Sequence, residues 1–501
     1  MLKTITLKGE QKKVLFLPAT NPIQIKGVAG SGKTTVSLYR AKHLLETQSN
    51  LFQEANIVIF TFNKTLVAYI EAILPYIYGG YQKESDELIT MIPDGLNIQV
   101  INFHKWAYSF IGLQPGKTLG WSEQIRVIDN LKIRLDSNLS NILQKSSEFF
   151  LEEISWIKGK LISTKEEYLN IQRTGRGKTD RVTQDDKDRI WGLYLKYEEE
   201  LSVRGKVDFD DYARISLKKI EDTPNWIPPY THIIIDEAQD LNKAQILTIS
   251  KLVSEETKSL TIIADAAQRI YKSGFNWMEV GLNVRGGRTV ELKRNYRNSV
   301  HIARAALSLL SKEEDQSEFT KGMTARKGGE KPKVGYFKCY KEQLSYLNDE
   351  LSKLYDDDQA MGTVVLHRTN EGISSIKNYL SSCGHIVESI KSKNSVNYGS
   401  DSVKLCTMSS IKGLEFNNVF ILDLADDVIP FPPGFIDKDD EYHISTERRL
   451  LYTCLTRARN RLYLLCDQDN PSRYIKEIGA DSYDIITMED DNDFNEDDLP
   501  W

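Results

Sequence analysis

The stretch GVAGSGKTT, Gly27 to Thr35, constrains the fold of this chain more than any other part of the sequence. A short apolar, strand-like run precedes it and a helix-like pattern follows it, which is the setting of a phosphate-binding loop. In such a loop, small residues let successive backbone N–H groups close around a phosphate at the start of a helix. We therefore expect Lys33 to neutralise the β and γ phosphates of a nucleotide and the Thr34 hydroxyl to ligate Mg²⁺. The loop residues expected to contact the nucleotide are Gly27, Gly30, Ser31, Gly32, Lys33, Thr34 and Thr35.

Two acids follow a second apolar run, at Asp236 and Glu237. The run Thr231–Ile235 is typical of a buried parallel strand, and its carboxyl end is where α/β sheets bind ligands. We expect Asp236 to hold Mg²⁺ through water opposite Thr34, and Glu237 to orient and deprotonate the water that attacks the γ-phosphate. Acids at a helix N-terminus are the alternative for this pair, and a glycine-rich turn without a ligand is the alternative for the loop. Both alternatives weaken because the two motifs occur together.

Composition restricts the class of protein. At 501 residues the chain is too long for one core and suggests roughly three domains. No apolar run approaches a membrane span and the N-terminus has no signal-like stretch, so we expect a cytoplasmic protein without a membrane contact. The five cysteines form no C-x-x-C pair and the histidines show no metal-ligand spacing near them. We therefore expect neither zinc nor disulfides, and mostly buried thiols.

The net charge of −6 is unevenly distributed. Residues 489–498 carry seven acids and no base, and without them the chain has a net charge of about +1. A nearly neutral body can still hold a basic groove, because clustering of charge matters more for nucleic acid than the total. The acidic segment itself is typical of a disordered tail that binds a protein, mimics nucleic acid or only aids solubility.

Aromatic residues follow two expected strands early in the chain. The runs Ile57–Phe60 and Ile98–Ile101 each lead into an aromatic mixed with a cation or an amide. This pairing suits single-stranded nucleic acid, because bases stack on rings while lysines and amides hold phosphates. Filling of the core by Phe62, Phe103 and Trp106 is an equal alternative.

Residues 111–206 change to long, charged helical patterns, including Trp121–Leu143 and Asp185–Leu201. Between these patterns lies a glycine-containing loop, residues 171–182, that has four bases within nine residues. A charge run is usually only a solvated face. The glycines in this loop nevertheless favour contacts from Arg176 and Lys178 to a nucleic-acid backbone.

A second α/β unit occupies roughly residues 301–470 and has no phosphate-binding loop of its own. Its expected strands are residues 333–337, 363–366, 403–407, 419–422 and 462–466. The stretch Glu447–Arg459 is predicted to be a helix rich in arginine, which suits contact with phosphate and stabilises charge in phosphoryl transfer. Ion pairs of these arginines with Glu447 or with the acids of residues 437–441 are the alternative.

Taken in order, the motifs resemble those of a superfamily 1 helicase of the UvrD/Rep/PcrA type. They are Gln11, GVAGSGKT, FTFNKTL, NFHKWA, IIIDEAQD, ADAAQRIY, LKRNYRN, TMSSIKGLEF and RRLLYTCLTRA. The resemblance implies an α/β fold with two RecA-like P-loop lobes, with ATP and Mg²⁺ in the cleft between them and single-stranded nucleic acid across their top. It divides the chain into a first lobe of residues 1–110 and 207–300, a helical insertion of residues 111–206, a second lobe of residues 301–470 and an acidic tail of residues 471–501.

The same resemblance implies roles for individual residues. Gln11 would read the adenine edge, Tyr296 would stack on the base, and Glu415 would reach the ribose or help to close the cleft. The catalytic set would be Lys33, Glu237, Gln268, Arg297 and Arg457, with Gln268 as a γ-phosphate sensor and the two arginines as arginine fingers. By this resemblance, contacts with the strand would come from Phe62, His104 and Tyr271. The residue patterns described above add Asn63, Lys64, Arg176 and Lys178 to these contacts.

The chain departs from the family's pattern in three places. Thr35 stands where the family often has an arginine that can sandwich adenine, which bears on base selectivity. The third motif differs at Ala264, Ala267 and Arg269, and Ser273 stands where a strand-stacking tryptophan would lie. Only about twenty residues, 385–404, separate two expected elements of the second lobe, so the family's large insertion there is expected to be absent or reduced to a loop.

We therefore expect an ATP-driven translocase or helicase that acts on single-stranded nucleic acid, DNA rather than RNA, in the 3′-to-5′ direction. The alternative is a nucleotide-switched module that binds nucleic acid and recruits or regulates a partner, such as a separate nuclease, through the acidic tail or the helical insertion. No nuclease-like or zinc-like segment follows Arg461, so we expect no cutting activity.

Overall fold

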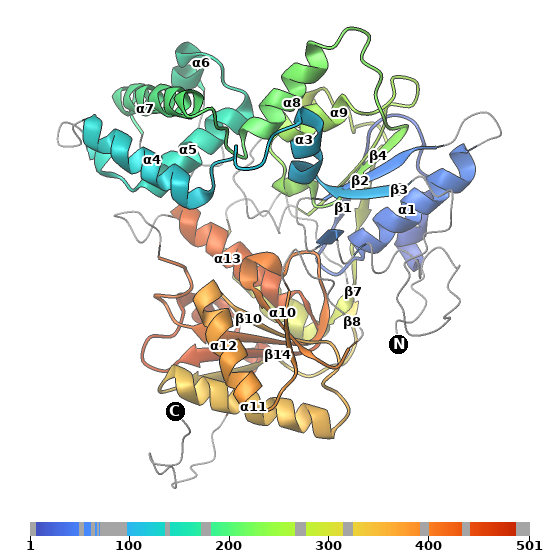
Figure 1. Ribbon diagram of the computed structural model, residues 1–501. Coiled ribbons are helices and arrows are strands. Elements are labelled where there is room, and N and C mark those ends of the chain that lie inside the picture. The colour runs from blue at the N-terminus through green and yellow to red at the C-terminus, as the bar shows by residue number, and fades with distance from the viewer. Residues whose placement is uncertain are drawn as a thin grey trace.

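The computed structural model describes residues 7–49, 55–61, 66–67, 70, 98–135, 141–171, 182–265, 277–313, 324–390, 400–432 and 441–486. The described chain forms two open sheets of parallel strands with helices around them, and a helical body beside the first sheet (Figure 1). The fold is therefore α/β, as the alternation of strand-like and helix-like patterns predicted.

The first sheet has six strands in the order β3-β2-β4-β5-β1-β6, and all neighbouring strands are parallel. Its strands are β1 (Ile23–Gly27), β2 (Ile57–Thr61), β3 (Ile98–Asn102), β4 (His232–Ile235), β5 (Ser259–Ala264) and β6 (Thr289–Leu292). β2, β4 and β5 are buried along their whole length, because a hydrophobic cluster covers each face of the sheet. The adjacent carboxyl ends of β4, β5 and β1 meet at one edge, where such sheets bind ligands.

The helices around this sheet are η1 (Gly9–Phe16), α1 (Lys33–Gln48), α3 (Phe103–Ile111), α8 (Asp211–Glu221) and α9 (Lys243–Ser250). α3 follows β3 directly because the Asn102 side chain accepts hydrogen bonds from its first free N–H groups. Phe103 and Trp106 turn inward onto Phe60, and only 1% and 7% of their surfaces are exposed. These two rings therefore fill the core, and the hypothesis that they stack on nucleic acid is wrong.

The helical insertion consists of α4 (Trp121–Arg134), α5 (Ser147–Lys160), α6 (Lys165–Asn170) and α7 (Gln184–Val203), and it has a hydrophobic core of its own. The sequence pattern predicted one helix from Trp121 to Leu143, but α4 ends at Arg134 and residues 141–144 form a separate 3-10 turn. Thr118 and Val207 pair with each other where the chain leaves the first lobe and returns to it.

A buried ion cluster joins the insertion to the first lobe. The ammonium of Lys158, near the end of α5, lies 2.6 Å from Glu198, 2.7 Å from Asp208 and 2.9 Å from Asp211. Asp208 also accepts a hydrogen bond from the backbone N–H of Asp211, at the start of α8. Because removal of one partner from such a cluster leaves a buried charge uncompensated, these groups hold α5 firmly against α8.

The second sheet has seven strands in the order β11-β12-β10-β13-β14-β9-β15, again all parallel. Its strands are β9 (Lys333–Phe337), β10 (Thr363–His367), β11 (Val387–Ser389), β12 (Val403–Thr407), β13 (Phe416–Leu424), β14 (Ala458–Asp467) and β15 (Asp484–Ile485). Its helices are α10 (Val300–Leu309), α11 (Tyr340–Asp356), α12 (Asn370–Ser382) and α13 (Glu441–Leu455). β11 and β12 pair directly, and only residues 390–402 connect them, so no further domain is inserted at this place.

The arginine-rich stretch is not one helix to its end. α13 ends at Leu455, and β14 begins at Ala458 because that residue pairs with Phe416 of β13. The prediction of a helix as far as Arg459 is therefore wrong over its last turn. Arg457 lies in the tight turn between α13 and β14, at the start of a central strand.

A short strand, β7 (Arg294–Ser299), carries the chain from the first lobe to the second, and it pairs with β8 (Thr324–Arg326) (Figure 1). The backbone N–H of Tyr296 donates to the carbonyl of Gly30 at 2.9 Å, on the first lobe. The side chain of Asn298 donates to the carbonyls of Thr456 and Ala458, on the second. β7 is therefore bonded to both lobes.

Among the helices that the structure describes, none is long and apolar enough to cross a membrane. All five cysteines are free thiols; three are buried, whereas Cys339 and Cys383 are exposed. The described residues contain no group of three or more His, Cys, Asp or Glu side chains arranged to hold a metal ion by themselves.

Candidate nucleotide site between the lobes

The phosphate-binding loop runs from Gly27 at the end of β1 to Lys33 at the start of α1. Gly30 and Gly32 have φ angles of 73° and 79°, in the left-handed region that favours glycine. A Cβ atom on Gly30 would lie 2.1 Å from the Asn295 side chain, and one on Gly32 would lie 2.4 Å from that of Gln11. The loop is thus enclosed by η1 and β7, and side chains larger than glycine do not fit at these two positions.

Three oxygen atoms hold the ammonium group of Lys33. They are the carbonyls of Gly27 at 3.1 Å and Val28 at 3.2 Å, and the carboxylate of Asp265 at 2.9 Å. Asp265 follows β5, which is adjacent to β1 in the sheet, and both members of the ion pair are buried. The lysine therefore lies at the loop, where a phosphate group would compete with Asp265 for its charge.

Asp236 and Thr34 fit the magnesium site that the sequence predicted. Burial, with the Glu237 carboxylate beside it, raises the pKa of Asp236 to about 7, and the Thr34 hydroxyl acts in the opposite direction. One carboxylate oxygen of Asp236, Oδ2, is buried and has no hydrogen-bond partner among the described residues. A partnerless carboxylate oxygen beside a hydroxyl suits Mg²⁺, which usually takes one or two protein ligands together with water and substrate phosphates.

Glu237 follows directly, and its backbone is left-handed, with φ of 56°. Its Oε2 atom accepts a hydrogen bond of 2.5 Å from the side chain of Gln239. Burial alone would raise the pKa of Glu237, but Lys412, Lys33 and Arg457 outweigh it and hold the pKa below its ordinary value. Glu237 is therefore an ionised carboxylate able to accept a proton.

Two arginines reach this site from the opposite side. Arg297 projects from β7, and its Nε donates to Glu415 at 2.7 Å. Arg457 is 2% exposed, and its Nε donates to the carbonyl of Thr453 at 3.0 Å. Burial, together with the charge of Arg297, lowers the pKa of Arg457 to about 10. Two neighbouring cations in a buried place favour an anionic ligand between the lobes.

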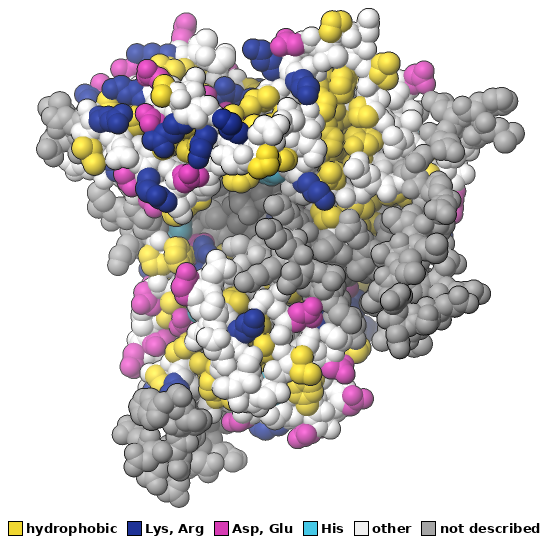
Figure 2. Space-filling view, viewed as in Figure 1, with side chains coloured by type: hydrophobic (Ala, Val, Ile, Leu, Met, Phe, Trp, Pro, Cys, Tyr) yellow, Lys and Arg dark blue, Asp and Glu magenta, His cyan; other side chains and the backbone are white. Residues whose placement is uncertain are grey.

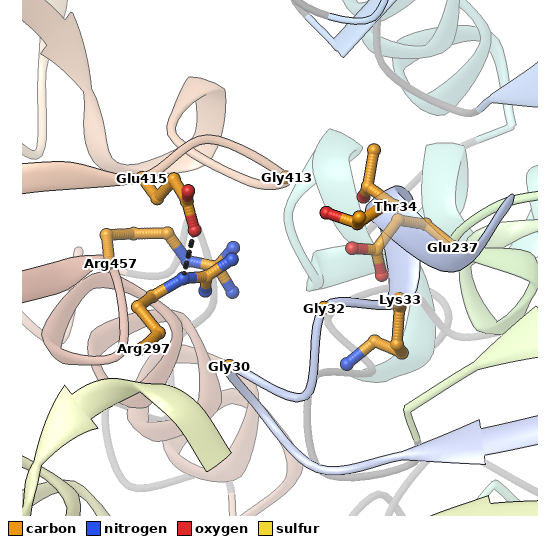
Figure 3. Close-up of a pocket in the computed structure, with 10 residues that line it drawn as sticks. Gly30, Gly32, Lys33, Thr34, Glu237, Arg297, Gly413, Glu415 and Arg457 are labelled. Carbon is orange, nitrogen blue, oxygen red and sulfur yellow. Dashed lines mark hydrogen bonds and ion pairs between the residues drawn. The ribbon is translucent and has the colours of Figure 1, made fainter. Parts of the chain in front are cut away.

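These groups line one pocket between the two lobes. In Figure 3 the two arginines and Glu415 face Lys33, Thr34 and Glu237 across it. The lining residues are Gly30, Gly32, Lys33, Thr34, Thr35, Glu237, Arg297, Gly413, Glu415 and Arg457. The structure therefore brings together the predicted loop, the predicted base and both predicted arginine fingers, which come from segments far apart in the sequence.

Gln11 and Tyr296 lie together beside the loop. The Gln11 amide donates to the Ser31 carbonyl at 2.7 Å and accepts from the N–H of Lys8 at 2.8 Å. The Tyr296 hydroxyl donates to the Lys8 carbonyl at 3.2 Å. The fully buried Arg40, on α1, donates to the carbonyls of Leu17 and Pro18, just after η1, and so fixes the end of the helix that carries Gln11. That Gln11 binds the edge of the adenine base stays a prediction, because in this structure the Gln11 amide is bonded to the loop backbone.

Glu415 accepts from both Arg297 and Arg459, whose guanidinium lies 2.8 Å away. Burial would raise the pKa of Glu415, but these arginines hold it below its ordinary value. The carboxylate therefore orients Arg297 in this structure, and its predicted contact with the ribose stays a prediction.

A second and larger hollow, of about 580 Å³, lies where the insertion and both lobes meet. His104 lines it, and its contact with nucleic acid stays a prediction. Phe209 lies beside His104, with 5.9 Å between the ring centroids, and is 46% exposed. Sequence reasoning missed Phe209; the available signal was an aromatic residue in VDFDDYARI, where the chain returns to the first lobe.

Cationic side chains also line this hollow, namely Lys160, Lys243 and Arg368. Arg368 is held by two hydrogen bonds, of 2.8 and 2.9 Å, to the buried carboxylate of Glu447. Glu447 thus pairs with Arg368, whereas Arg448 and Arg449 of the same helix pair with Glu313. Residues 437–440, the other acids considered for these arginines, lie outside the described part of the chain. Lysine and arginine side chains also gather on the outer face of the insertion, with acids among them (Figure 2).

Several predicted site residues lie outside the described part of the chain. They are Phe62, Asn63, Lys64, Arg176, Lys178, Gln268 and Tyr271. Their roles stay predictions.

The site and the fold together define a class. A phosphate-binding loop after β1, an Asp–Glu pair after the buried strand β4 and two arginines from the opposite side are the architecture of P-loop NTPases built from two RecA-like lobes.

Comparison with family models is more specific. The UvrD/REP helicase N-terminal domain matches residues 7–275, and the UvrD-like helicase C-terminal domain matches residues 290–394 and 385–468. The chain therefore belongs to the UvrD/REP helicase family, as its motifs predicted.

Curated relatives are distant and longer. The ATP-dependent DNA helicase srs2 of Schizosaccharomyces pombe is 25% identical over 69% of this chain and 39% of its own length. The ATP-dependent DNA helicase PcrA of Staphylococcus epidermidis is 24% identical over 70% of this chain and 46% of its own length. The chain spans about half the length of the curated relatives it matches, or less. Among solved structures, the match to the PRRSV helicase covers 91% of this chain and 55% of the helicase chain, with 10% sequence identity and a TM-score of 0.35.

Proposed function

We propose that this chain is an ATP-driven translocase or helicase that acts on single-stranded DNA in the 3′-to-5′ direction. The observation that carries the proposal is the convergence of Arg297 and Arg457 on the pocket that also holds Lys33, Thr34 and Glu237. The preference for DNA is supported by relatives that are DNA helicases. The direction rests on the resemblance of the motifs to the family alone.

Hydrolysis of ATP follows from the charges around the pocket. Mg²⁺, held by Asp236 and Thr34, would neutralise the developing charge on the phosphates. Lys33 exchanges its bond with Asp265 for one with the nucleotide. Glu237, kept ionised by the surrounding cations, takes a proton from the attacking water.

The site requires both lobes. Glu237 follows β4 in the first lobe, Arg457 lies in the second, and Arg297 lies on the connecting strand β7. Hydrolysis then depends on closure of the cleft, because only the closed arrangement brings both arginines to the developing charge. Repeated closing and opening of the cleft, with the two lobes holding the strand in turn, would move the protein along the strand.

The hollow between the insertion and the two lobes is the proposed strand site. Phe209 and His104 offer ring faces for bases, and Lys160 and Lys243 offer cations for phosphates. This combination binds single strands with little sequence preference, because every base has a face that can stack.

Steady-state ATPase measurements test the function. Wild-type protein is assayed with single-stranded DNA, single-stranded RNA and duplex DNA at two salt concentrations, with Glu237→Gln as the inactive control. We expect strong stimulation by single-stranded DNA that weakens as salt rises, because phosphate contacts release counterions. Equal rates for wild type and Glu237→Gln, or no stimulation by any strand, would refute the proposal.

Direction needs a separate assay. Streptavidin is bound to a biotin at either the 5′ or the 3′ end of a single strand, and its ATP-dependent displacement is followed. Movement in the 3′-to-5′ direction displaces streptavidin from the 5′ end only. Displacement from the 3′ end only would reverse the proposed polarity and leave the ATPase proposal intact.

The alternative of a module that recruits a partner stays a prediction. It was motivated by the reduced insertion in the second lobe, the altered third motif and the acidic tail. Residues 266–276 of the third motif and residues 487–501 of the tail lie outside the described part of the chain.

A further inference from the structure

Gln239 lies behind the catalytic carboxylate, in the short turn η4 (Ala238–Asp240). It is 6% exposed, and the pocket residues that surround the nucleotide site do not include it. Its Nε2 atom donates to Glu237 Oε2 at 2.5 Å, and its Oε1 atom accepts from the backbone N–H of Asp265 at 3.0 Å. One amide therefore connects the end of β4 with the end of β5.

The connection continues to the phosphate-binding loop. Asp265, whose N–H binds Gln239, uses its carboxylate to hold Lys33 at 2.9 Å. A row of bonded groups therefore runs from Glu237 through Gln239 and Asp265 to Lys33. The row joins the proposed base to the lysine expected at the γ-phosphate, across two neighbouring strands.

The chemistry of the amide fixes the orientation of the Gln239 side chain. A backbone N–H can only donate, so the Gln239 oxygen must face Asp265 and the NH₂ group must then face Glu237. The backbone of Glu237 is left-handed, which is uncommon for a residue other than glycine and is kept only where the surroundings hold it. The direction of its side chain therefore depends on the groups that bond to it.

We propose that Gln239 is a positioning residue that fixes the Glu237 carboxylate at its working distance from the nucleotide phosphates. This inference rests on the proposed function, because it assigns a role within the same hydrolytic site. Loss of the hydrogen bond would leave nucleotide binding unchanged and slow the chemical step.

Two variants of similar size separate positioning from simple structural support. Gln239→Met removes both hydrogen bonds. Gln239→Glu keeps an oxygen for the Asp265 N–H but loses the donor to Glu237 and places a second carboxylate beside it. We expect kcat to fall on the order of 100-fold in both variants, with the larger loss in Gln239→Glu. KM for ATP and Kd for ADP should stay within about a factor of two of wild type.

The outcomes are distinct. If Gln239 only tethers β5, Gln239→Glu keeps near-wild-type kcat while Gln239→Met loses activity, and the positioning role is overturned. Unchanged kcat in both variants, or a loss that appears in KM alone, also overturns it. If the wild-type protein shows no more ATP turnover than Glu237→Gln, the proposed function itself is overturned. The proposed role of Gln239 then falls with it. Thermal melting of each variant identifies any that fails to fold, in which case Gln239→Asn, which shortens the same amide, takes its place with the same expected loss in kcat.

Discussion

Lys412 of the second lobe and Asp240 of the first form a buried ion pair, with 2.5 Å between Nζ and Oδ2. Asp240 is three residues beyond Glu237, and Lys412 is the strongest of the cations that lower the pKa of that base. A residue of this contact between the lobes therefore also helps to keep the pKa of the Glu237 carboxylate low.

Removal of one partner from this pair should destabilise the protein strongly. Lys412→Met leaves Asp240 buried without its cation, and such a change typically costs about 3–5 kcal/mol of unfolding free energy. The double variant Asp240→Asn with Lys412→Met should recover part of that loss, because it buries no unpaired charge. Denaturant unfolding of the single and double variants measures both effects. Lys196→Met, at an exposed lysine of α7, is the control and should change little.

Each of the two pocket arginines should be needed for turnover and not for folding. Arg457→Ala and Arg297→Ala should each lower kcat by about 10³-fold or more, the range found for arginine fingers. Arg461→Ala is a matched control, because Arg461 pairs with Glu330 and does not line the pocket. Single-turnover ATP hydrolysis measures the effect. A loss of less than tenfold in both pocket variants would contradict the assignment.

Phe209 should contribute to strand affinity. Base stacking on an aromatic side chain is worth about 1–3 kcal/mol, so Phe209→Ala should weaken binding of a single-stranded oligonucleotide by roughly 5- to 150-fold. Fluorescence anisotropy with labelled strand measures the change. Phe16 is an exposed aromatic outside the hollow, and Phe16→Ala should leave the affinity unaltered. Equal losses in both variants would show that the hollow is not the strand site.

Buried His232, at the start of β4, should make stability fall in mild acid. Burial, with Arg40 nearby, lowers the pKa of His232 from 6.5 to about 4. Between these values the unfolded chain takes up a proton that the folded chain does not, so unfolding free energy decreases as pH falls from 6.5 to 4. The contribution is about 3 kcal/mol at most. His232→Asn should flatten this part of the profile, measured by denaturant unfolding at several pH values; an unchanged slope would exclude His232 as its source.

Most strands were predictable because each is a short apolar run that ends in polar residues. β9 and β12 begin and end where the pattern predicted. The phosphate-binding loop and the Asp236–Glu237 pair were predictable for a related reason, since their chemistry is carried by adjacent residues. The end of α13 was not predictable, because strand pairing at Ala458 stops a helical pattern that continues in the sequence.

Features that depend on distant segments required the structure. The pair of Asp240 and Lys412 joins two lobes, and neither residue has a local pattern that points to the other. The inward direction of Phe103 and Trp106 follows from their packing on Phe60 of a neighbouring strand, so local sequence left their role open. Phe209 lines a hollow where three parts of the chain meet, so its own surroundings in the sequence did not point to this position.

β7 links the lobes, supplies Arg297, and at Tyr296 is bonded to Gly30 of the phosphate-binding loop. β7 therefore both connects the lobes and forms a wall of the proposed nucleotide pocket. If the second lobe rotates about this strand, as the proposed function requires, the movement acts directly on the backbone of the phosphate-binding loop. Opening of the cleft would then also loosen the hold of the loop on the phosphates.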